Sequence, residues 1–279
     1  MALSPLRSKT LHHGRSLSMP SESRPAMSQF DENLSRIRAL GATCSSLSSM
    51  NARINELKNL YDSMDDLLQL PQNFSLEGQE QILDDYIRLL DACSTVKDLI
   101  SLTKQGVREL LSAVRRKDAN VTQSYLTSRR KSKKMIQKSL NNLRSFGSKS
   151  NAVSLEKDML KDAESKDMLK DAESVTLSLF EFLLSYVMGT KVQERKSGWS
   201  LVSKLMHFKK VSPQDEETDL NEFKKVASFL QLSQESWVEQ LVNHLKGMDS
   251  SIQILEEGLE VLFRLLIKTR VSLLNTLNH

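Results

Sequence analysis

The sequence has 279 residues, of which 27% are charged and 39% hydrophobic, with only nine glycines, five prolines and 5% aromatic residues. This composition argues against a β-sandwich and favours long helices. The net charge of +4 is too small to require a nucleic-acid partner, and we do not expect one.

Residues 1–28 form a basic tail that contains serines and prolines. Its apolar residues are too few to offset the entropy lost on ordering, so the sequence predicts disorder. The alternative is an organelle transit peptide, most simply a chloroplast one, because such peptides are rich in Ser and Arg and poor in acids. The first residues lack the continuous apolar core of a secretory signal, and we therefore expect a cytoplasmic protein.

The tail contains RSLSMP at residues 15–20, which has the R-S-x-S-x-P spacing of a 14-3-3 docking site. Arg15 precedes Ser18 by three residues, as basophilic kinases prefer, and Pro20 completes the motif. Phosphorylation of Ser18 would add nearly two negative charges for an arginine cluster on the adaptor to bind. The hypothesis is a phosphorylation-dependent docking segment; an inert tail is the alternative.

Residues 29–279 are predicted to form a single helical-bundle domain. Apolar residues recur every seven positions from Leu40 to Leu68, and Pro71 ends this helix. A second long helix with Ser75 as its N-cap follows. Because the connection is short, we expect these two helices to form an antiparallel hairpin.

The next segment, from Ala119 to Leu155, contains eight basic residues and no acidic residue. A weaker apolar stripe predicts a helix with a basic face. We treat this face as a candidate site for an anionic membrane surface, or else as an ordinary solvated face. The candidate residues are Arg129, Arg130, Lys131, Lys133, Lys134 and Lys138.

An exact duplication follows, with KDMLKDAES at residues 157–165 and again at 166–174. Nine helical steps rotate by about 180°, so one continuous helix cannot bury both copies on the same face. The second copy continues the apolar stripe of the next helix. We therefore expect a loop or a solvated repeat within 147–174, with the inserted copy outside the core.

The helix predicted at Val175–Met188 is apolar but too short to span a bilayer. Lys196–Val211 is basic and amphipathic, which fits either packing into the bundle or an interfacial membrane helix. Residues 212–219 are predicted to form an acidic linker.

The strongest pattern is a run of heptads from Val238 to Thr276, which predicts a long terminal helix with a buried seam. Gly247 and Gly258 interrupt it, and a kink near Gly247 is expected. A seam of this kind is typical of the spine of a bundle, or of a coiled coil that pairs between chains. Its apolar positions include Leu241, Leu245, Met248, Ile252, Leu255, Leu259, Leu262, Leu266 and Leu273.

No motif for catalysis, for a metal or for a cofactor competes with these helices. The histidines and cysteines lack zinc-site spacing, and the glycines form no phosphate-binding loop. Cys44 and Cys93 lie on apolar stripes, as buried thiols in a reducing compartment do. We expect no enzyme and no cofactor.

Four segments resemble the plant-specific BYPASS-like family: HHGRSLSMPSESRP at 12–25, FDENLSRIRAL at 30–40, KSGWSLVSKLM at 196–206 and EEGLEVLFRLLIKTRVSLLN at 256–275. The resemblance implies a helical protein of land plants, linked through some relatives to root and shoot development. It supplies no catalytic residues, and the duplicated KDMLKDAES departs from its pattern.

The sequence therefore predicts an all-α protein: an elongated antiparallel bundle of long helices with coiled-coil-like heptad stripes. We expect a non-enzymatic interaction or regulatory protein of plant development, with phosphorylation of the tail as a control. The alternatives are a peripheral membrane protein that binds anionic lipid and a self-associating coiled-coil protein.

Overall fold

The computed structural model describes residues 23–41, 46–69, 79–118, 120–152, 162–189, 221–230 and 238–277. These residues contain helices and no strands, which confirms the all-α fold. The helices are α1 (Ser23–Gly41), α2 (Leu47–Leu68), α3 (Gln79–Arg115), α4 (Val121–Ala152), α5 (Asp162–Met188), α6 (Glu222–Phe229) and α7 (Val238–Leu277).

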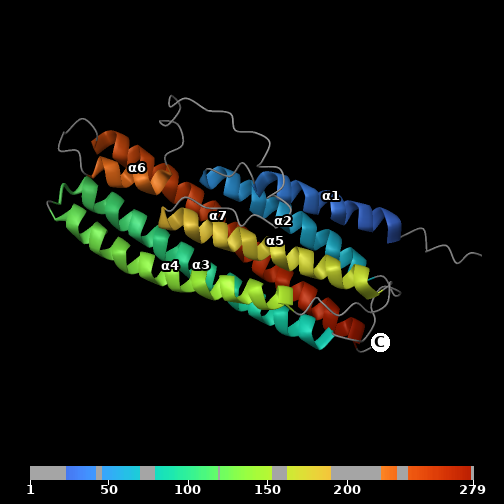
Figure 1. Cartoon of the computed structure of the whole chain (residues 1–279). Coiled ribbons are helices and arrows are strands. Elements are labelled where there is room, and N and C mark those ends of the chain that lie inside the picture. The colour runs from blue at the N-terminus through green and yellow to red at the C-terminus, as the bar shows by residue number, and fades with distance from the viewer. Residues whose placement is uncertain are drawn as a thin grey trace, which may run out of the picture.

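The long helices pack in two layers along a common direction, as Figure 1 shows. In one layer α7 lies between α2 and α3. In the other layer α5 lies between α1 and α4, and it also packs onto α2 and α3. The short α6 packs against α7 at one end of the bundle. The predicted elongated bundle is therefore present, and α7 is its spine.

The expected hairpin of the second and third helices is wrong in one respect, because α7 separates α2 from α3 over most of their length. The α3–α7 pair is antiparallel, since Lys97 pairs with Glu260 whereas Arg108, further along α3, pairs with Asp249. The α2–α7 pair instead runs parallel. Helices α2 and α3 are antiparallel as expected, but they are not neighbours.

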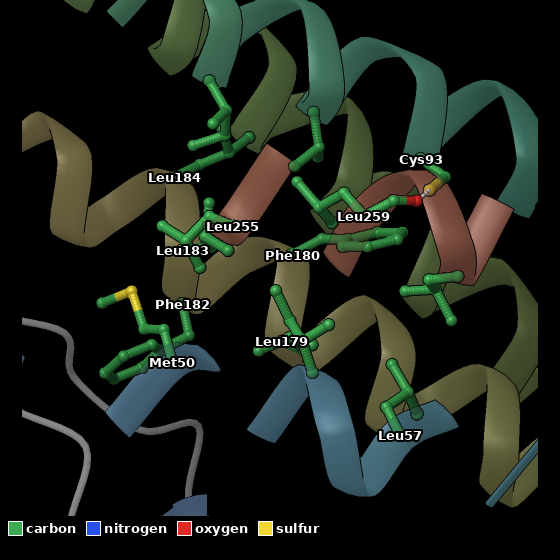
Figure 2. Close-up of a cluster of buried hydrophobic side chains, with 14 of the residues drawn as sticks. Met50, Leu57, Cys93, Leu179, Phe180, Phe182, Leu183, Leu184, Leu255 and Leu259 are labelled. Carbon is green, nitrogen blue, oxygen red and sulfur yellow. Dashed lines mark hydrogen bonds between the residues drawn. The ribbon is translucent and has the colours of Figure 1, made fainter. Parts of the chain in front are cut away.

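The predicted seam of α7 is buried as its heptads require: Leu241, Leu245, Leu255, Leu259, Leu262 and Leu266 are all 0% exposed. Figure 2 shows Leu259 and Leu255 surrounded by side chains of the other helices, with Phe180 of α5 and Cys93 of α3 near Leu259. The helix continues through Gly247 and Gly258. The seam is thus buried against the other helices of the same chain.

The N-terminal part differs from the expectation in two ways. Helix α1 begins at Ser23, inside the segment expected to be a disordered tail. Pro25 is compatible with this start because the first helical turn needs no amide donor there. The single helix expected across Leu40–Leu68 is two helices, since α1 ends at Gly41 and Ser46 caps α2 through a capping box with Ser49.

The region of the duplication is more helical than expected. Helix α4 reaches Ala152, beyond Gly147, because one glycine costs only about 1 kcal/mol in a helix. Helix α5 begins at Asp162 and contains the whole second copy, in which Met168, Leu169 and Ala172 are buried. The second copy therefore belongs to the core, as its continuation of the apolar stripe predicted, and the segment expected to hold a loop or a solvated repeat is helical at 147–152 and from 162 onward.

Candidate functional site

The outward face of α4 is the candidate site. Helix α4 lies at an edge of the bundle, where it contacts α3 and α5. Its buried side contains Ile136, Leu140 and Leu143. The opposite side carries four exposed cations within an arc of about 100°, at about 100° per residue. We call these four residues the basic face: Arg130, Lys131, Lys134 and Lys138.

The basic face has no charge partner within the described part of the chain. Helix α4 contains no acidic residue. Many cations of the other helices form ion pairs, for example Arg38 with Asp171 at 2.7 Å and Lys268 with Asp65 at 2.8 Å. No ion pair joins a cation of the basic face to another described residue. Their positive field is therefore directed at solvent, where an acidic surface can approach.

Arg129 does not belong to this face, although its place in the basic run predicted that it would. Its guanidinium lies 4.7 Å from the centre of the Phe223 ring of α6 and donates a hydrogen bond to the backbone carbonyl oxygen of Val187 in α5. Burial lowers its pKa. Arg129 therefore holds α4, α5 and α6 together. The signal was present in the sequence, because Arg129 precedes Ile136 by one heptad and shares its stripe.

Lys133 lies between the solvent-exposed basic face and the buried surroundings of Arg129. Its side chain is exposed, but its pKa is lowered, first by partial burial and then by the charges of Arg129 and Lys224. Lys224 belongs to α6, which the sequence did not place next to α4. Like charges thus gather where α4 meets α6.

Several predicted features lie outside the described residues. They are the docking motif with Arg15, Ser18 and Pro20, the amphipathic segment 196–211, the acidic segment 212–219 and Cys44. The other thiol, Cys93, is buried as predicted, and burial raises its pKa to about 12. A thiol of this kind carries little thiolate at neutral pH and is a poor nucleophile.

Two further features concern metals and membranes. In the described ranges, no three His, Cys, Asp or Glu side chains are grouped so that they could hold a metal ion. Within the same ranges, every helix is too short or too polar to cross a membrane.

Residues 53–276 match the family model described as Protein BPS1, and this match covers most of the chain. The chain belongs to this family. The match extends from α2 to α7 and includes the basic face of α4. It supports the resemblance to the BYPASS-like family, and it is consistent with a plant developmental protein. No curated protein and no solved structure matches the chain.

Proposed function

We propose that this chain is a non-enzymatic interaction protein of plant root and shoot development, and that it docks an acidic partner protein on the basic face of α4. One observation carries the proposal: four exposed cations share one side of an edge helix and have no ion-pair partner among the described residues. Charges arranged in this way speed the encounter with a complementary surface and select against basic partners.

Neutralising the basic face is expected to remove the partner and to leave the fold intact. The variant is Arg130→Gln, Lys131→Gln, Lys134→Gln and Lys138→Gln. The matched control removes the same charge from exposed cations of other helices, with Arg36→Gln, Arg88→Gln, Lys246→Gln and Arg264→Gln. Both variants and the native chain are purified from plant tissue, and the bound proteins are quantified by mass spectrometry.

With the first variant, the recovered amount of one or more acidic proteins should fall by about tenfold or more. With the control, the recovered amount should stay at the native level. Each substitution of an exposed residue changes the free energy of unfolding by only about 0.5 kcal/mol or less. Both variants should therefore melt near the native temperature. Equal recovery of every bound protein by the two variants would contradict the proposal.

An anionic membrane surface is the second candidate. Met135 is 51% exposed next to Lys131, Lys134 and Lys138, and an apolar side chain among cations is typical of interfacial helices. Sedimentation with vesicles of phosphatidylserine and phosphatidylcholine distinguishes the two candidates. Binding that needs phosphatidylserine, weakens with salt and is lost only in the first variant would favour the membrane over a protein.

We also propose that phosphorylation of Ser18 controls docking by recruiting a 14-3-3 adaptor. The support is the motif of Arg15, Ser18 and Pro20. Ser18→Ala is expected to abolish the recovery of 14-3-3 proteins from plant tissue, whereas Ser16→Ala is expected to reduce it less, because the phosphate belongs at position 18. If both variants recover the adaptor as the native chain does, the proposal fails.

A further inference from the structure

A cavity of about 270 Å³ lies between α3 and α4 near the turn that joins them. Small side chains leave this space open: Ser124, Ser128 and Ser132 of α4 line it at one-turn intervals, and Gly106 of α3 lines it from the other helix. A Cβ atom added at Gly106 would meet no atom within 4 Å. The volume is near the lower end for cavities that hold small ligands, which begin at about 300 Å³.

Arg129 lines this cavity, and no ion pair joins it to another residue of the described ranges. Its contacts there are the Val187 carbonyl oxygen and the Phe223 ring, and no acidic side chain of these ranges influences its pKa. Lys133 of the same helix has a charge of the same sign, and the charge of Arg129 contributes to the lowered pKa of Lys133. A largely buried cation without an anion is costly, and a bound anion would offset that cost.

The rest of the lining restricts the charge and shape of such an anion. Three other charged residues line the cavity, namely Glu109, Arg116 and Asp118. Arg116 is a second cation beside Arg129, whereas the two carboxylates would repel a dianion such as phosphate more strongly than a monoanion. Leu110, Ala113 and Phe223 supply apolar walls, and the Tyr125 side chain lies beside Arg129. A planar guanidinium binds a carboxylate with two parallel hydrogen bonds.

We propose that this cavity binds a small organic monocarboxylate, with its carboxylate on Arg129 and its apolar part against Leu110 and Phe223. The inference is independent of docking on the basic face, because those four cations do not line the cavity.

Benzoate is a suitable probe because it combines a carboxylate with a flat apolar ring, and benzamide has the same shape without the charge. Binding to the full chain is measured by titration calorimetry, with inorganic phosphate as a third probe. Benzoate should bind, and Arg129→Gln should weaken its binding by about tenfold or more, since a charge-assisted hydrogen bond is lost. Arg115→Gln removes an exposed charge near the same end of α3 and should leave benzoate affinity unchanged.

A second pair of variants tests the cavity without changing Arg129. Gly106→Leu fills the open space and should abolish benzoate binding while the chain stays folded. Gly247→Leu makes the same change at an exposed glycine with open space around it and should bind benzoate as the native chain does. Benzoate affinity unchanged in folded Gly106→Leu, equal binding of benzamide, or tighter binding of phosphate would each overturn the proposal.

Discussion

Leu259→Ala is expected to lower the free energy of unfolding by about 2–5 kcal/mol, as truncation of a fully buried leucine does. Leu259 is 0% exposed and lies in the middle of the α7 seam, near Phe180 and Cys93 (Figure 2). Its loss removes apolar contacts with more than one helix and leaves a cavity that packed helices fill only partly. Denaturant unfolding followed by circular dichroism measures the change.

Ile254→Ala is the matched control, because Ile254 belongs to the same helix but is 53% exposed. Its unfolding free energy should change by about 0.5 kcal/mol or less. If Leu259→Ala and Ile254→Ala unfold at the same denaturant concentration, α7 is not the spine of the bundle.

Gly258→Ala is expected to destabilise the protein by about 1–3 kcal/mol, although alanine is the better helix former. A Cβ atom at position 258 would lie 2.8 Å from Cγ2 of Ile54, which is buried in α2. Real Cβ atoms do not approach so closely, so either the Ile54 side chain must leave its rotamer or α2 and α7 must move apart. The melting temperature and the denaturant midpoint should both fall.

Gly247→Ala is expected to have the opposite sign and to stabilise the same helix by up to about 1 kcal/mol, because a Cβ atom there meets nothing within 4 Å. Ile54→Ala provides a further test, since it removes the atom that the new Cβ would strike. In that background Gly258→Ala should cost less than in the native chain. Stabilisation by Gly258→Ala in the native chain would show that α2 and α7 are not in close contact.

The basic face is the part of the candidate site that the local sequence predicts. A helix with period 3.6 places Arg130, Lys131, Lys134 and Lys138 together on one side, whatever the rest of the fold does. Their exposure was therefore predictable once the stripe of Ile136 and Leu140 was recognised. Arg129 was misassigned because a count of charges ignores the heptad that places it on the buried stripe.

Local sequence predicts most of the helices and the side of each that is buried, although it missed the start of α1 at Ser23 and the break between α1 and α2. The seam of α7 is the clearest case, because its leucines repeat with the helical period. The leucines in the middle of the seam, Leu255, Leu259 and Leu262, are all buried. The second copy of KDMLKDAES follows the same rule, because only that copy continues the stripe of α5. Periodicity is a local property of the chain, and burial of one face follows from it.

Which faces meet depends on the tertiary structure. In the folded chain α7 lies between α2 and α3, and Phe223 of α6 lies against Arg129 of α4. A cavity remains beside Gly106. An apolar stripe is satisfied by any complementary stripe, because the hydrophobic effect is non-directional and depends on the area buried. The choice among partners comes from close fits such as Gly258 against Ile54 and from ion pairs such as Arg108 with Asp249, which join residues far apart in the sequence.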